Sequence, residues 1–339
     1  MKILVLGGTV FVGRVIVEAA LDRNHEVTIF NRGKYRPELY PYVRKIRGDR
    51  TADLAMLKGD ANTWDAVIDP SAFTPEQVTA TAHVLAHRAE HYIFVSTIGV
   101  HRPAAGSPFD AAADRMAGSS VYDELKARSE DALAQAWPGR LTITRPGFLV
   151  GPYDNTRRFT YWVRRIARGG DVLVPGPAER RLQLIDGRDY GEWLVRLAEG
   201  RVTGAYLATG PTEPMTMGQI MEECRVALNP QARLHWVDEG QLIARGVKSF
   251  EDLPVWMTEE DPRFGVLRNA DITHSVSAGL RFRPFSDTVR DTHRWDRIDG
   301  VGPPQVLEGA TRTSPITAEP MDYATEQDIL ADLGLLSTV

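Results

Sequence analysis

Met1-Lys-Ile-Leu-Val-Leu-Gly7-Gly8-Thr9-Val-Phe11-Val12-Gly13 opens the chain and joins an apolar run directly to a glycine-rich turn. Residues 3–6 are continuously apolar, as expected for a parallel strand that is buried on both faces. Apolar residues then recur at helical spacing, so the turn leads into the N-terminus of a helix, whose free N–H groups and positive dipole end attract a pyrophosphate. The pattern predicts a dinucleotide site. The residues expected to form it are Gly7, Gly8, Thr9, Phe11, Val12 and Gly13.

The rest of the first half alternates between strand-like and helix-like stretches. A strand over residues 26–30 completes the start of a βαβ unit within about thirty residues. Such alternation is typical of a doubly wound parallel sheet. The sequence therefore predicts an α/β protein with a Rossmann-type doubly wound parallel sheet and a smaller C-terminal substrate-binding lobe. Further strands are expected at 43–47, 66–69, 92–96 and 141–145, and helices at 75–87 and 122–137.

The pattern changes after Arg145-Pro-Gly, where an aromatic and basic helix and a turn-rich stretch begin. Residues 1–150 and about 175–210 are expected to form the dinucleotide-binding domain. The substrate-binding lobe is expected to combine about 151–174 with 211–298. Proline, threonine and serine are frequent after residue 300, so 299–339 is predicted to be an extended tail whose apolar end docks on this subunit or on a neighbour.

Composition narrows the class of protein. The chain has 339 residues and a net charge of -5, which argues against a nucleic-acid-binding surface and favours a small-molecule substrate. Cys224 is the single cysteine, so no intrachain disulfide can form and no metal site is expected. No apolar run approaches the roughly twenty residues of a membrane span, and no signal-peptide cleavage site follows the first strand. We expect a cytoplasmic protein without membrane contact.

Tyr122 and Lys126 are four residues apart near the start of a predicted helix, which places the phenol and the ammonium on one face. A free phenol has a pKa near 10, and a neighbouring cation lowers that pKa, so the pair is suited to proton transfer. A packed ring beside a solvated charge would have the same spacing. Ser96 and Thr97 follow a predicted strand, at the edge where open α/β sheets bind ligands.

With these motifs the chain, over roughly residues 1–298, resembles the extended branch of the short-chain dehydrogenase/reductase superfamily, which contains epimerases, dehydratases and reductases. The resemblance implies that Thr97 hydrogen-bonds the substrate oxygen and that Tyr122 donates or accepts its proton. It also implies that Lys126 binds the nicotinamide ribose and tunes Tyr122. Ser96 is the alternative to Thr97 and is expected to contact the cofactor or the substrate. The spacing of twenty-five residues from Thr97 to Tyr122 favours Thr97.

The end of the second strand bears on the choice of cofactor. NAD-specific members of the family place an acidic residue there, whereas this chain has Asn31-Arg32-Gly33-Lys34. The guanidinium of Arg32 suits a 2′-phosphate, with Lys34 as a second cation, so NADP is favoured and NAD stays possible. A solvated basic loop is the alternative. Asp49 resembles the family's adenine-contacting aspartate, although a helix N-cap would look identical.

The glycine turn departs from the family's usual Gly-x-x-Gly-x-x-Gly at Val10. Valine adopts positive φ only at a cost, so we expect a helical backbone at this position and a pyrophosphate site of altered detail.

Substrate contacts are predicted at positions spread along the chain. Arg181 lies on a strand that resembles the one carrying a phosphate-binding arginine in nucleotide-sugar enzymes. Arg181 is shifted by one residue from the position of that arginine, so its side chain is expected on the opposite face of the strand. Tyr161 and Trp162 could equally be core residues. The candidates are Ser96, His101, Arg157, Tyr161, Trp162 and Arg181.

Three functions are compatible with these motifs. The leading one is an NADP-dependent reductase or dehydrogenase acting at a carbonyl/alcohol centre of a small metabolite, with Tyr122 as acid or base. A nucleotide-sugar epimerase or dehydratase that retains NAD(P) is the alternative within enzymes. A cofactor-gated RNA- or protein-binding protein is the alternative from another class. Members of the family often pair, so a homodimer is a further expectation.

Overall fold

A computed structural model of the chain describes residues 1–59, 63–101, 108–115, 120–261, 265–299 and 320–336. The chain forms two compact units, each built from segments that are separate in sequence. Unit 1 comprises Met1–Leu149, Leu184–Thr212 and Gly265–Phe282, and unit 2 comprises Val150–Gln183, Glu213–Phe264 and Arg283–Val339. No helix in the described ranges combines the length and the apolar character that a membrane span requires.

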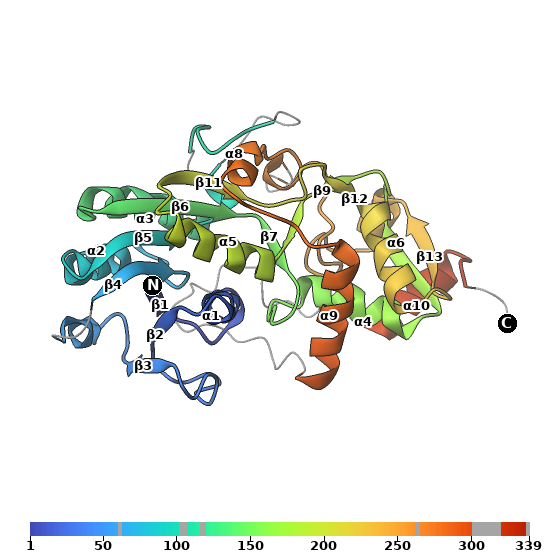
Figure 1. Cartoon of the computed structure of the whole chain (residues 1–339). Helices are drawn as coiled ribbons and strands as arrows, with labels where there is room; N and C mark the ends of the chain where they lie inside the picture. The colour runs from blue at the N-terminus through green and yellow to red at the C-terminus, as the bar shows by residue number, and fades with distance from the viewer. Residues whose placement is uncertain (60–62, 102–107, 116–119, 262–264, 300–319, 337–339) are drawn as a thin grey trace. The chain divides into compact units, whose positions relative to one another are not determined.

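Unit 1 contains a seven-stranded sheet of order β11-β6-β5-β4-β1-β2-β3, in which every pair is parallel (Figure 1). This confirms the predicted Rossmann-type sheet. The strand β7 (Phe148–Val150) pairs with β10 and leads into unit 2. The elements of unit 1 are β1 (Lys2–Leu6), α1 (Phe11–Asp22), β2 (Glu26–Asn31), β3 (Arg44–Arg47), η1 (Leu54–Lys58), β4 (Trp64–Asp69), α2 (Pro75–Leu85), β5 (Ala89–Val95), η2 (Ile98–Val100), α3 (Val121–Ala136), β6 (Arg140–Pro146), β10 (Leu184–Asp186), α5 (Gly187–Glu199), β11 (Gly204–Ala208), η3 (Gly265–Leu267) and α8 (Thr273–Ser277).

Helices cover both faces of the sheet because strand side chains alternate between the two faces. Ile3 and Val5 of β1 point into one core cluster, which includes residues of α1 and α5. Leu4 and Leu6 point into the other cluster, which includes residues of α2 and α3. All four side chains are almost completely buried, which explains the unbroken apolar run at the start of the chain.

The segment 265–282 lies in unit 1, whereas the sequence suggested the substrate-binding lobe for it. Contacts with β11 explain the difference. The His274 ring stacks on the ring of Tyr206 at 4.5 Å between centroids, and Ser275 Oγ donates to the Leu207 carbonyl. Residues 175–183, which were expected in the dinucleotide-binding domain, lie in unit 2, because β9 (Arg181–Leu182) pairs antiparallel with β12 (Met215–Thr216).

Unit 2 contains two short sheets and five helices among its described residues. One sheet pairs β9 with β12, and the other pairs β8 (Asp171–Pro175) with β13 (Arg233–Val237) in parallel. The helices are α4 (Arg158–Arg168), α6 (Met217–Leu228), α7 (Glu239–Ala244), α9 (Phe285–Ile298) and α10 (Tyr323–Asp332).

The described part of the predicted tail, 320–336, contains a helix rather than extended chain alone. Asp322 begins α10 by accepting from the Thr325 N–H, and Leu330 is fully buried. Glu326 forms an ion pair with Arg165 and accepts a hydrogen bond of 2.9 Å from the Leu173 N–H of β8. Helix α10 is therefore an integral part of unit 2. Residues 300–319 and 337–339 of the predicted tail lie outside the described residues.

Candidate functional site

The glycine turn connects β1 to α1 with two residues in the left-handed region. Gly7 has φ +122° and Gly8 has φ +95°, values that favour glycine. A Cβ on Gly13 would lie 2.6 Å from the Gly8 nitrogen, so the first turn of α1 can pack on the loop only without a side chain there. These positions agree with the three glycines that the sequence singled out.

The start of α1 is open to an anion. Val10 occupies the N-cap position, and its apolar side chain makes no capping hydrogen bond. The first turn contains no acidic residue, so its N–H groups and dipole fit the pyrophosphate of a dinucleotide. The predicted helical backbone at Val10 is wrong. Val10 is extended, with φ -126° and ψ 136°, which also avoids positive φ.

The loop after β2 is tied to the glycine turn through Asn31. Its Nδ2 donates to the Gly7 carbonyl at 2.8 Å, and its Oδ1 accepts from the Gly33 N–H at 3.0 Å. Arg32 Nη1 lies 4.0 Å from Asp49 Oδ2, and Lys34 is exposed. Asn31 therefore joins the predicted pyrophosphate site to the predicted 2′-phosphate site.

Asp49 does not cap a helix, because Asp53 holds the N-cap position of η1. Its Oδ1 instead accepts from the N–H and the hydroxyl of Thr51, at 2.8 and 2.6 Å. These two hydrogen bonds, with the charge of Arg32, lower the pKa of Asp49. Asp49 thus provides a partly exposed carboxylate beside Arg32, just after β3, as a contact to the adenine would require.

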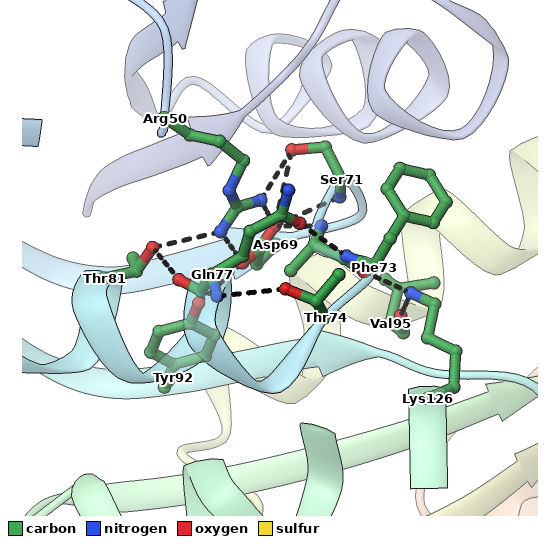
Figure 2. Close-up of polar contacts among 11 residues, drawn as sticks. Arg50, Asp69, Ser71, Phe73, Thr74, Gln77, Thr81, Tyr92, Val95 and Lys126 are labelled. Atoms are coloured by element: carbon green, nitrogen blue, oxygen red, sulfur yellow. Dashed lines mark hydrogen bonds and ion pairs between the residues drawn. The ribbon is translucent and has the colours of Figure 1, made fainter. Parts of the chain in front are cut away.

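Lys126 is 1% exposed and follows Tyr122 by one turn of α3. Figure 2 shows its side chain beside Val95, the last residue of β5. Its Nζ donates to the carbonyls of Ala72 and Val95, at 2.7 Å each. Burial is the main cause that lowers the pKa of Lys126 to about 7. The ammonium is therefore held by backbone carbonyls that follow β4 and end β5.

Aromatic rings surround this ammonium. Nζ lies 4.8 Å from the ring centroid of Phe94, 5.1 Å from that of Phe73 and 5.8 Å from that of Tyr122. A cation over aromatic faces is attracted by their negative electrostatic potential. The structure thus places Tyr122 and Lys126 together, as the spacing of four residues predicted.

The burial of Lys126 leads to a prediction on stability. Its folded pKa of about 7 lies below the ordinary 10.5, so between these pH values the unfolded chain binds more protons and stability rises with pH. We expect Lys126→Met to be more stable than the wild type at pH 7, by a margin that shrinks as the pH rises to 10. Urea unfolding at several pH values measures this margin. Lys58→Met, at an exposed position, is the control, and a pH-independent margin for Lys126→Met would contradict the prediction.

Ser96 and Thr97 follow directly on the Val95 carbonyl that accepts from Lys126. Ser96 is 2% exposed, and its Oγ has no hydrogen-bond partner among the described residues. Thr97 is half-buried, and its Oγ1 accepts from the Gly99 N–H at 3.1 Å, which begins η2. A Cβ on Gly99 would collide with the carboxylate of Asp123, so η2 packs closely against α3. The short helix that Thr97 begins therefore packs against the helix that carries Tyr122.

An ion pair that sequence reasoning missed lies behind this site. Arg50 and Asp69 form a bidentate pair with two distances of 2.9 Å, and the Tyr92 hydroxyl donates to Asp69 at 2.6 Å. Asp69 is fully buried. The signal in the sequence was a carboxylate at the end of the strand expected at 66–69, because a charge that is buried in a parallel sheet requires a partner.

His101, one of the predicted substrate residues, is 1% exposed. Its Nε2 is 2.9 Å from Nη1 of Arg145, which also pairs with Glu130. Burial, with the charge of Arg145, lowers the pKa of His101 to about 4, so the ring is neutral at neutral pH. These contacts place His101 in an ion network of unit 1.

The other predicted substrate residues belong to unit 2. Trp162 has no exposed surface, and its Nε1 donates to the Pro254 carbonyl, which agrees with the alternative of a core residue. The ring of Tyr161 packs edge-on against it at 5.0 Å between centroids. Arg157 precedes α4 with φ +60°. Arg181 is exposed beside the buried Leu182 and lines a small, mainly apolar pocket of unit 2.

Comparisons with known proteins agree with this geometry. A family model described as the NAD dependent epimerase/dehydratase family matches residues 3–206. This match confirms the resemblance to a family of epimerases and dehydratases that the motifs indicated.

Individual relatives differ in what their names describe. The chloroplast stem-loop binding protein of 41 kDa b from Arabidopsis thaliana is 27% identical over 203 residues, covering 54% of this chain and 51% of that protein. The chain thus spans about half the length of this relative. The 2-alkyl-3-oxoalkanoate reductase of Stenotrophomonas maltophilia is 27% identical over 256 residues, covering 67% of this chain and 76% of that one. The Bordetella bronchiseptica enzyme WbmH, solved with NAD+, shares the fold with a TM-score of 0.66 at 18% identity, covering 88% of this chain and 99% of that one.

Proposed function

The chain belongs to the NAD-dependent epimerase/dehydratase family, and from this premise we propose that it is an NADP-dependent reductase or dehydrogenase of a small metabolite with a carbonyl/alcohol centre. The observation that carries the proposal is Lys126, buried beside the Tyr122 ring and held by the carbonyls that end β5 and follow β4. The reductase name of one relative supports this choice.

The resemblance to the family supplies the role proposed for each residue. The bound cofactor would supply or accept a hydride at its nicotinamide ring. Tyr122 gives a proton to the substrate oxygen, or takes one from it, through its phenol oxygen. Two N–H groups of Lys126 donate to carbonyls, and its Nζ lies 5.8 Å from the centre of the Tyr122 ring, where a positive charge would favour the phenolate. Thr97 holds the substrate oxygen by a hydrogen bond, and Ser96 is the alternative donor.

The proposed preference for NADP rests on Arg32 and Lys34, which follow β2. Arg32→Ala should weaken the binding of NADPH by about 10- to 100-fold, the scale of a lost charge-assisted hydrogen bond, and the binding of NADH by less than about threefold. Isothermal titration calorimetry measures both affinities, with Arg44→Ala at an exposed position as the control. Equal losses for the two cofactors would show that Arg32 does not contact the 2′-phosphate.

The test of the function itself begins with the cofactor content of the purified protein, measured by denaturation and absorbance. Calorimetric titration with NADPH and NADH follows, and then a screen of carbonyl compounds for oxidation of NADPH. Free exchange of NADPH and turnover of a carbonyl compound would support a reductase. Oxidised cofactor that is retained through purification would favour the epimerase or dehydratase instead.

A second candidate rests on the name of the chloroplast relative, which describes stem-loop binding. In this case the chain would bind RNA under the control of its cofactor. The net charge of -5 opposes this function. Titration of a stem-loop RNA into the protein, with and without NADPH, separates the two: binding without reductase activity would favour the second candidate.

A further inference from the structure

Figure 2 shows the ion pair of Arg50 and Asp69, at the carboxyl end of β4, with Lys126 to its right. Both guanidinium Nη atoms of Arg50 contact Asp69, and Nη2 also donates to the Thr81 hydroxyl at 3.0 Å. With the Tyr92 hydroxyl, these donors satisfy a carboxylate that has no exposed surface. Such a charge is tolerated in a protein interior only when it is paired and hydrogen-bonded.

The same carboxylate holds the backbone that follows β4. Asp69 Oδ1 accepts from the N–H groups of Ser71 and Ala72, at 3.0 and 3.1 Å. Arg50 Nη1 donates to Ser71 Oγ at 3.0 Å. The Ala72 carbonyl, at the other side of that residue, accepts from Lys126 Nζ. A continuous series of hydrogen bonds thus leads from Arg50 through Asp69 and Ala72 to Lys126.

The segment 71–73 is fixed from its other side as well. The Phe73 N–H donates to Gln77 Oε1 at 2.8 Å, and the Phe73 ring lies 6.1 Å from the ring of Tyr122. A Cβ on Gly7 would lie 3.7 Å from Ser71 Cβ, so the segment also contacts the glycine turn. The residues held by Asp69 therefore lie between the predicted pyrophosphate site and Lys126.

We propose that Arg50 and Asp69 are positioning residues, which fix the segment 71–73 against the glycine turn and, through the Ala72 carbonyl, hold the Lys126 ammonium in place. The proposal rests on the proposed function for the role of Lys126 in turnover, whereas the contacts can be tested without turnover.

The charges near Lys126 allow a test of the proposal, because they determine the direction in which the pKa of Lys126 changes when one of them is removed. Asp69 and Glu130 raise the pKa of Lys126, and Arg50 lowers it, against the larger effect of burial. Asp69→Asn removes a negative charge but keeps the positive charge of Arg50. If the fold around Lys126 is unchanged, the pKa of Lys126 should therefore fall below its wild-type value. A merely loosened structure would let water reach Lys126 and raise its pKa toward 10.5.

The first experiment uses the wild-type protein without ligand. Amide hydrogen exchange, measured by NMR, should show the N–H groups of Ser71 and Ala72 slowed at least about 100-fold, although both lie outside regular structure. Exchange at the rate of an open loop would overturn the proposal, because Asp69 would then not hold this segment.

The second experiment follows the titration of Lys126 by NMR of 13C-labelled lysine, with Lys126→Met to assign the signal. Asp69→Asn should lower the pKa of Lys126 by about one unit, the scale of one lost opposite charge. Asp65→Asn, on the same strand, should leave it unchanged. An unchanged or raised pKa in Asp69→Asn would overturn the proposal, and if that variant does not fold, the exchange experiment decides. Neither readout depends on the substrate or on reductase activity.

Discussion

Tyr122→Phe is expected to lower kcat by about 10²- to 10⁴-fold while the affinity for NADPH changes by less than about twofold. The variant keeps the ring that packs 6.1 Å from Phe73 and removes only the phenol oxygen. A residue that transfers a proton in the transition state contributes to kcat without contributing to cofactor binding.

Steady-state kinetics and calorimetry on the same preparation measure the two effects. Tyr42→Phe is the matched control, since Tyr42 is fully exposed and should tolerate the change. A Tyr122→Phe variant whose kcat stays within about tenfold of the wild type would remove Tyr122 from the proton transfer. A variant that loses cofactor affinity instead would assign Tyr122 to binding.

Gly13→Ala should have the second large effect. The added Cβ would lie 2.6 Å from the Gly8 nitrogen, so α1 and the glycine turn must move apart. We expect the affinity for NADPH to fall at least about 100-fold, since the pyrophosphate contacts depend on this turn. The free energy of unfolding should fall by about 1–3 kcal/mol, the usual cost of overpacking.

Calorimetry and urea unfolding measure these two quantities. Gly240→Ala in α7 is the control, because its Cβ would meet only the end of the Asp238 side chain within 4 Å. If Gly13→Ala bound NADPH and unfolded like the wild type, the close contact between α1 and the turn would not be needed for the site.

The sheet and the glycine turn were predictable because their signals are local. Buried parallel strands require apolar residues on both faces, and Ile3 to Leu6 satisfy that requirement within four positions. The spacing of Tyr122 and Lys126 likewise depends only on helix geometry. Predictions of this kind need no knowledge of distant parts of the chain.

Features that depend on distant partners were not predictable. Arg50 and Asp69 are nineteen residues apart, and nothing local shows that a buried carboxylate will meet that particular guanidinium. His101 is buried through Arg145, which lies forty-four residues away. Segment 265–282 joins unit 1 through contacts with β11 that a change in composition does not reveal. The predicted homodimer stays a prediction.

The segmented construction of the two units has a consequence for synthesis on the ribosome. Unit 1 takes its last segment from residues up to Phe282, so its first 149 residues emerge long before it can close. At 5–20 residues per second this interval is on the order of ten seconds. Folding of unit 2 is completed later still, because Glu326 must be synthesised before it can pair with Arg165. Apolar β-strands exposed during such a delay are the surfaces that chaperones bind, so the folding yield of this protein should depend on translation speed and chaperone supply.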